Sequence, residues 1–433
     1  MSGRLFHKVV LDNGIRVVME EIPSVRSASV GIWVEVGSRD EAETEAGLAH
    51  FVEHMFFKGT VHRSAREIAQ EMDGLGGELN AFTSRETTAF YSNVIEEHLP
   101  KAVDLLADLF RHSVFPPVEI AREKRVVLEE INMVEDDPED LIYDLHTANV
   151  WRGNPIGRPI LGDVKVIRSI ARRQIQDFLG RRYRPERTVI SVAGRFSRSV
   201  LVKQLNRLFR TFGPRGLRPR RTDRPGLVGI RRPPVTNGRL FLRPKKLEQA
   251  HLCLGLPGLP LTHKDRYGIY ALNLLLGGGM SSRLFQEIRE RRGLVYSIYS
   301  HHAGFQDAGM LTVYAASSPK AVRQVVQLTL RELRRLRERG VHREELLRAV
   351  NQMKGGILLS LESTNSRMSR LAKDEIYFGR YFSLEETLRE INRVSKRQVE
   401  HLADRLFDTR QLSLTVLGPI GSNTRPYEAL LAG

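Results

Sequence analysis

The sequence predicts an α+β protein of two duplicated sandwich domains, each a mostly antiparallel sheet covered by helices. The chain has 433 residues, well beyond the roughly 250 at which single hydrophobic cores stop growing. The same order of strand-like and helix-like segments occurs twice, which suggests an internal duplication. A proline- and arginine-rich stretch separates the two occurrences. We therefore expect domains at 1–212 and 239–433, joined by a basic linker at 213–238.

The first half opens with strand patterns and continues with helical periodicity. Strands are expected at Lys8–Leu11, Ile15–Glu20, Ala28–Val36, Glu78–Phe82 and Thr87–Val94, with a closing strand at Thr188–Ala193. Helices are expected through His50–His54 and near Ser64–Met72, followed by long amphipathic helices. The acidic run that begins at Glu135 either attracts basic peptides or starts a helix, with Asp137 as N-cap and Pro138 at the first helical position.

The second half repeats this order. Strands are expected at Leu240–Leu242, His251–Leu256, Val295–His302, Gly309–Ala315 and Gln411–Leu417. Helices are expected at Asp265–Leu276, at Ser282–Arg291 and between Pro319 and about Ala403.

Composition limits the classes of function. Hydrophobic residues make up 41% of the chain and charged residues 27%, as in ordinary soluble proteins. No apolar run approaches the roughly 18 residues that span a bilayer, so we expect no membrane span. Cys253 is the single cysteine, which excludes an intrachain disulfide and a cysteine-liganded metal. The N-terminus lacks a signal-peptide pattern, and we expect a cytoplasmic protein.

The net charge of +16 would by itself suggest a polyanion partner. Many of the arginines lie in the stretch 213–239, which carries the single acid Asp223. This distribution favours a solvated linker, so polyanion binding is the less favoured alternative.

The segment His50-Phe51-Val52-Glu53-His54 carries the clearest chemical signal. Residues i and i+4 of a helix share one face, so both imidazoles can bind one Zn²⁺ while Glu53 stands beside the open coordination position. The segment is apolar on nearly every side, which describes a buried helix. A metal would satisfy ionisable groups that are otherwise costly to bury, although histidines satisfied within the core are the alternative.

A catalytic zinc site takes three protein ligands, so one more must come from elsewhere. The helical pattern at Ile120–Val134 places Glu130 beside the apolar stripe and Glu129 almost opposite to it. Glu130 is therefore the expected third ligand. Glu123, two turns earlier on the same face, either orients a ligand or is an ordinary surface acid.

These residues resemble the inverzincin metallopeptidases of the pitrilysin, insulysin and mitochondrial-processing-peptidase family. The resemblance extends to Phe57-Lys58-Gly59-Thr60, to the stretch Gly77–Thr83, and to Gly277–Leu284 in the second half. It covers both halves of the chain. It implies a zinc-dependent endopeptidase with one Zn²⁺ per chain, bound by His50, His54 and Glu130, with Glu53 as the general base.

The resemblance also assigns residues that no local pattern indicates. Arg289 and Tyr296 match an arginine and a tyrosine that bind the substrate backbone, and Asn80 matches a substrate contact beside an edge strand. Short family members pair around a closed chamber, which implies a homodimer or a heterodimer with a related chain. Arg289 and Tyr296 of one subunit would then complete the zinc site of the other. The alternative is a non-catalytic partner subunit, but such subunits lack part of the zinc motif, and this chain has all of it.

Overall fold

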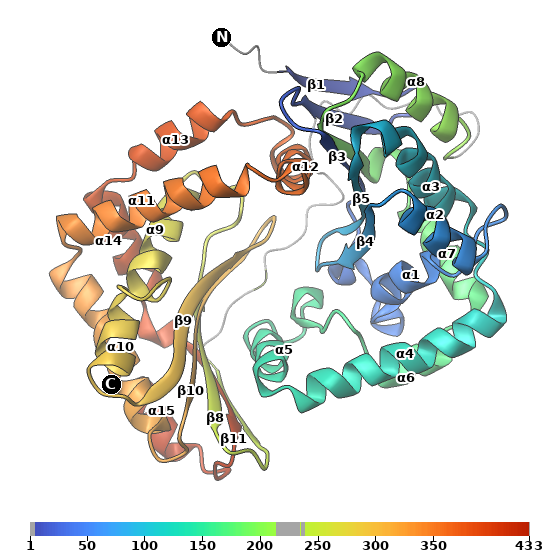
Figure 1. Ribbon diagram of the computed structural model, residues 1–433. Helices are drawn as coiled ribbons and strands as arrows, with labels where there is room; N and C mark the ends of the chain where they lie inside the picture. Colours follow the sequence, from blue (N-terminus) through green and yellow to red (C-terminus); the bar gives the residue numbers. More distant parts are fainter. Residues whose placement is uncertain (1–4, 214–233, 235–238, 433) are drawn as a thin grey trace. The chain divides into compact units, whose positions relative to one another are not determined.

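The computed structural model describes residues 5–213, 234 and 239–432 (Figure 1). The described residues form two compact units, each with its own sheet. The first unit draws on the ranges 1–131, 159–230 and 358–381, and the second on 132–158, 231–357 and 382–433. Each unit thus includes a segment from the other half of the chain. The predicted linker 213–238 lies outside the described residues except for Gly213 and Pro234.

The first sheet has six strands in the order β1-β2-β6-β3-β5-β4. Their bounds are β1 Leu5–Val10, β2 Arg16–Glu21, β3 Ser27–Val34, β4 Glu78–Thr83, β5 Thr88–Ile95 and β6 Thr188–Gly194. All of its neighbouring strands pair antiparallel except β2 and β6, which run parallel. Strand β4, which carries Asn80, lies at one edge of the sheet, as the family resemblance implies.

The second sheet repeats this topology in the order β7-β11-β8-β10-β9. Its strands are β7 Leu240–Pro244, β8 Ala250–Pro257, β9 Val295–Gly304, β10 Gly309–Ser317 and β11 Ser413–Gly418. Here β7 and β11 are the parallel pair, in the place of β2 and β6. This correspondence confirms the predicted α+β class and supports the internal duplication.

Helices in and around the first unit are α1 Leu48–Phe56, α2 Ala65–Gly74, α3 Leu99–His112, α4 Pro117–Asp136, α6 Val164–Ser169, α7 Arg172–Arg182 and α8 Arg198–Phe209. Those in the second are α9 Arg266–Leu276, α10 Val322–Arg339, α11 Arg343–Ser360, α13 Leu384–Asn392, α14 Lys396–Leu406 and α15 Arg425–Ala432. The helix expected at Ser282–Arg291 has π-helical geometry over Phe285–Glu290. No helix in the described ranges is long and apolar enough to cross a bilayer.

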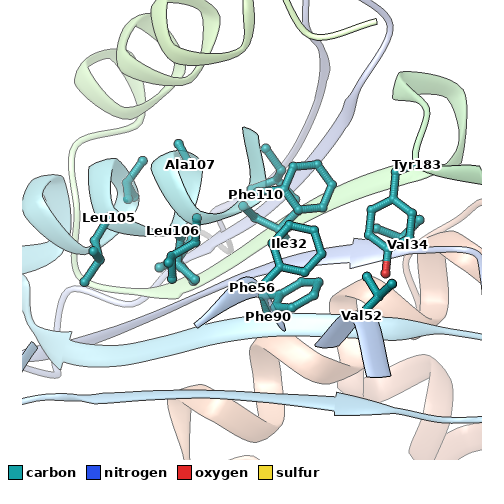
Figure 2. Packing of buried hydrophobic residues seen from close by; sticks show 14 of the residues in the cluster. Ile32, Val34, Val52, Phe56, Phe90, Leu105, Leu106, Ala107, Phe110 and Tyr183 are labelled. Atoms are coloured by element: carbon teal, nitrogen blue, oxygen red, sulfur yellow. The ribbon is translucent and has the colours of Figure 1, made fainter. Parts of the chain in front are cut away.

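One face of the first sheet packs against its main helical layer. Phe56 of α1, Phe90 of β5 and Phe110 of α3 pack together there, with ring centroids of Phe56 and Phe90 4.6 Å apart (Figure 2). Because side chains alternate along a strand, Val17 and Met19 of β2 face this core while Val18 joins a cluster on the opposite face.

The opposite face of each sheet is covered by one helix from the other half of the chain. Helix α12 (Thr364–Lys373) packs on the first sheet, where Met368 and Leu371 belong to the same buried cluster as Trp33. Helix α5 (Pro138–Val150) packs on β8 and β11 of the second sheet. Its N-cap is Asp137, whose side chain accepts hydrogen bonds from the backbone N–H groups of Glu139 and Asp140, as the helix-start interpretation requires.

The packing of α12 predicts an asymmetric pair of substitutions. Met368→Ala removes a fully buried side chain and should lower the free energy of unfolding of the first unit by roughly 2–5 kcal/mol. Met133→Ala makes the same chemical change at a side chain that is 69% exposed, and should have little effect. Urea unfolding followed by tryptophan fluorescence compares the two. Equal midpoints for both variants would show that α12 does not stabilise the sheet.

Candidate metal centre

Helix α1, which carries the His motif, is held at its start by a buried carboxylate. Gly47 precedes the helix in the left-handed region, with φ 93°, and a Cβ there would approach the carbonyl oxygen of Leu161 to 2.6 Å. The Glu41 carboxylate accepts hydrogen bonds from the N–H groups of Gly47 and Ala49 at 2.9 and 2.6 Å. These bonds satisfy donors that the helix leaves unpaired and so fix where α1 begins.

The structure brings His50, His54 and Glu130 together. The two Nε2 atoms lie 3.2 Å apart, and Oε2 of Glu130 lies 3.7 Å from Nε2 of His50 and 3.5 Å from Nε2 of His54. Two ligand atoms bound to one tetrahedral zinc ion would be about 3.3 Å apart, given bond lengths near 2.0–2.1 Å. The three atoms therefore have the spacing that a single zinc ion requires.

The state of the three groups also fits a cation. Oε2 of Glu130 is buried and has no hydrogen-bond partner within the described part of the chain. Burial, followed by the charge of His54, lowers the pKa of His50 to about 4, so this imidazole is neutral and can offer a lone pair. A buried carboxylate oxygen that faces two imidazole nitrogens is an uncompensated arrangement that a divalent cation would stabilise.

Helix α4 presents its carboxylates as the helical pattern predicts. Glu123 is 4% exposed and Glu130 is half-buried, whereas Glu129 is exposed. Oε1 of Glu123 lies 2.9 Å from Nδ1 of His54, and its Oε2 lies 2.7 Å from Nζ of Lys58. When the Nδ1–H group of His54 donates to Glu123, the Nε2 lone pair points to Glu130 and His50.

Charge around His54 favours its role as a hydrogen-bond donor. Burial is the largest influence and lowers its pKa, but the hydrogen bond that His54 donates to Glu123 and the charge of Glu130 outweigh it, so the net pKa is raised. The carboxylate of Glu123 has a lowered pKa: burial opposes ionisation, but the hydrogen bonds from His54 and Lys58 prevail. Glu123 is therefore an anion that orients the His54 ring.

Glu53 lies on the same helix and contacts strand β4. The Thr83 hydroxyl donates a hydrogen bond of 2.5 Å to Oε2 of Glu53. Burial raises the pKa of Glu53, and the bond from Thr83 only partly opposes this. A carboxylate with a raised pKa is a stronger base than an exposed glutamate, which suits proton transfer.

The three residues expected to bind substrate are Asn80, Arg289 and Tyr296. Asn80 is exposed on β4, the edge strand of the first sheet. Arg289 and Tyr296 lie in the second unit, in the π-helical segment and on β9 respectively. The guanidinium carbon of Arg289 lies 5.4 Å from the Tyr296 ring centroid, and Tyr296 is 79% exposed.

Sequence reasoning missed three side chains of this centre. Glu41 caps α1, Lys58 pairs with Glu123, and Thr83 contacts Glu53. Lys58 and Thr83 lie in segments that carried the family resemblance, which was the available signal for both. Glu41 had no signal, because a capping carboxylate separated from its helix by a loop matches no local pattern.

Comparison with known proteins matches most of the chain to one peptidase family. The family described as "Insulinase (Peptidase family M16)" matches residues 16–164, and "Peptidase M16 inactive domain" matches residues 169–353. A Bacillus subtilis protein named as an uncharacterized zinc protease is 41% identical over 418 residues, 96% of this chain and 99% of the relative. A Mycobacterium tuberculosis protein, also named as an uncharacterized zinc protease, is 43% identical over 417 residues, 96% of this chain and 93% of the relative.

Solved structures agree on the fold. A protease from Helicobacter pylori superimposes with a TM-score of 0.87 at 22% identity, covering 96% of this chain and all of that chain (100%). A Pseudomonas fluorescens structure titled as a peptidase M16 inactive domain gives a TM-score of 0.87 at 20% identity, covering 96% and 98%. At these identities the likeness concerns the fold alone.

The contact between Glu123 and His54 predicts a loss of metal affinity on substitution. Glu123→Gln removes the anion that orients the ring and should weaken zinc binding about 10–100-fold. Glu129→Gln makes the same change on the exposed side of α4 and should leave the affinity unchanged. Competition with a chelator of known zinc affinity measures both constants. Indistinguishable constants would contradict an orienting role for Glu123.

Proposed function

The chain belongs to the M16 (insulinase-type) peptidase family, and from this premise we propose that it is a zinc-dependent endopeptidase acting on peptides or unfolded polypeptides. The observation that supports this most directly is the spacing of 3.2–3.7 Å among the ligand atoms of His50, His54 and Glu130. The relatives named as zinc proteases favour zinc as the ion, with one per chain at this centre.

When bound, zinc would supply Lewis-acid polarisation of the scissile carbonyl and lower the pKa of water toward about 7. Glu53 then acts as the general base. Its Oε2 is engaged by Thr83, so Oε1 takes the proton from the attacking water and returns it to the departing amine. Glu123 keeps the His54 ring in one orientation throughout.

The substrate is proposed to bind as an additional strand along β4, the edge of the first sheet, with Asn80 beside it. Backbone hydrogen bonds of this kind give affinity with little selection for side chains. Arg289 and Tyr296 are proposed to hold substrate carbonyl groups and to stabilise the developing oxyanion. The exposure of Tyr296 leaves its hydroxyl available for such a contact.

We further propose that two chains pair around a closed chamber in the cytoplasm, as a homodimer or with a related chain. The chain carries the zinc ligands, the base and the Arg289/Tyr296 pair, so a homodimer would be self-sufficient.

A non-catalytic partner role is less favoured, because the chain carries a full set of these residues. The match to the inactive-domain description covers residues 169–353, where the sequence has no His-x-x-Glu-His motif. Most of the arginine-rich stretch behind the polyanion alternative lies outside the described residues.

The proposed role of Glu53 separates catalysis from metal binding. Glu53→Gln should lower kcat by at least about 10²–10⁴-fold because the proton acceptor is lost, while zinc content stays at one per chain. Glu43→Gln, an exposed position shortly before α1, serves as the matched control. Cleavage of a quenched fluorescent peptide and metal analysis of the same sample give both readouts. A fully active Glu53→Gln protein would refute the mechanism.

The proposed pairing of chains can be tested by complementation. Tyr296→Phe removes one hydroxyl and should lower kcat/KM about 10²–10³-fold with zinc still bound. If Tyr296 acts across the dimer, mixing this variant with Glu53→Gln and allowing subunits to exchange restores about a quarter of wild-type activity, because half of randomly paired dimers contain one intact site. Tyr267→Phe is the control. Native mass spectrometry verifies the exchange, and no recovery in exchanged dimers means that Tyr296 acts within one chain or not at all.

A further inference from the structure

We propose that the first unit carries a second divalent-metal site, formed by His62, Asp108 and His112, for a borderline ion such as Zn²⁺, Cu²⁺ or Ni²⁺. One ligand atom from each of the three residues lies within 4.8 Å of the others. Two imidazoles and one carboxylate are the donor set that first-row transition metals prefer. The site shares no residue with the centre on α1 and α4, and it does not depend on the proposed peptidase function.

The three side chains are arranged as in many metal sites, with two ligands from one helix and one from a loop. Asp108 and His112 lie one turn apart on α3, so their side chains project from one face. His62 comes from the loop between α1 and α2. Nδ1 of His62 lies 2.8 Å from Oδ1 of Asp108, and Nδ1 of His112 lies 2.9 Å from the same oxygen. Small side-chain rotations would open these distances to the roughly 3.3 Å that two ligands of one ion require.

The backbone holds the loop and the helix end in register. The N–H group of Val61 donates a hydrogen bond of 3.0 Å to the carbonyl oxygen of His112. The N–H group of Val114 donates one of 3.2 Å to the carbonyl oxygen of Gly59. The Thr60 hydroxyl oxygen accepts the N–H group of His62 at 3.0 Å. These hydrogen bonds fix the backbone at His62 and His112 before an ion binds. Binding therefore has to order fewer groups and costs less entropy.

The two carboxylate oxygens of Asp108 have different roles: Oδ2 holds the side chain in place, and Oδ1 is the proposed metal ligand. The side chain is 6% exposed. Its Oδ2 accepts hydrogen bonds from Thr60 at 2.7 Å and Arg63 at 2.8 Å, which fix the carboxylate plane. In the described part of the chain, the hydrogen bonds to Oδ1 come from the two imidazoles. An ion bound there would replace these two bonds, with each ring moving its proton from Nδ1 to Nε2 and releasing none.

Local charge favours a cation. The Arg63 guanidinium pairs with Glu71, Asp104 and Asp108, so three carboxylates surround one positive charge. Arg111 lines the same pocket, but its guanidinium donates to the carbonyl oxygen of Leu208 and to the Thr211 hydroxyl. The three carboxylates named here carry one more charge than the two guanidinium groups of Arg63 and Arg111. A divalent cation would reduce this excess of negative charge.

The site is open to solvent on one side. It borders a pocket of about 460 Å³, and the His62 side chain is 58% exposed. Water can therefore complete the coordination, and an ion can enter and leave without unfolding. Once bound, it would link the loop after α1 to the end of α3 and stabilise the folded state according to its occupancy.

Metal stoichiometry of the untagged full chain tests the proposal. Isothermal titration with ZnCl₂ should give two equivalents per chain for the wild type, one for His62→Ala/His112→Ala, and two for the control His401→Ala, which removes another exposed imidazole. Asp108 is kept because Thr60 and Arg63 depend on it. A double variant that binds as many equivalents as the wild type would overturn the proposal, whatever the occupancy of the first centre.

A second arm removes the first centre. In a His50→Ala/His54→Ala background one equivalent should remain, and adding His62→Ala/His112→Ala should abolish it. Co²⁺ absorption in the visible range reports the coordination geometry of the bound ion, and a zinc-dependent rise in Tm should follow the same pattern. Circular dichroism verifies that each variant is folded. If the Co²⁺ spectrum persists in the quadruple variant, the ion binds elsewhere and the assignment is wrong.

Discussion

The approach of one carboxylate oxygen on α4 to two imidazoles on α1 is the interaction on which the candidate centre depends. Neither helix can hold it alone, because Glu130 lies far from His50 and His54 in the sequence. Its separations of 3.2–3.7 Å exist because both helices contribute side chains to one buried cluster, in which Phe51 and Val127 are fully buried. Close packing of this kind leaves little freedom for either helix to shift.

The polar groups around that interaction each position a different part of the centre. Glu41 sets the start of α1, Glu123 orients the His54 ring, and Thr83 engages one oxygen of Glu53. Each contact removes one degree of freedom from a group that is proposed to bind the ion or move a proton. This arrangement is costly to bury without a cation, which is a physical reason to regard it as functional.

Much of the centre could be predicted because it is encoded by short periods. The spacing of His50, Glu53 and His54 needs only one helical turn, and the position of Glu130 follows from the apolar stripe on its own helix. The strands were located within one to three residues at most ends, since alternation and β-branched runs are local signals. Contacts such as Glu53 with Thr83 were inaccessible, because they depend on which strand occupies the sheet edge. A helix was predicted for the segment that carries Arg289, but its π-helical geometry was not, since that hydrogen-bond pattern leaves no periodic signature in the sequence.

The reciprocal placement of α5 and α12 has a consequence for how the protein is made. On the ribosome, α5 emerges before the strands β8 to β11 that it will cover, whereas the first sheet is complete long before α12 is translated. Until then no residue of α12 covers the sheet face that bears Val18, Trp33 and Ala89. Exposed apolar surfaces of this kind bind chaperones or aggregate. Cutting the polypeptide at its midpoint would consequently yield two fragments that must find each other to mature, rather than two autonomous modules.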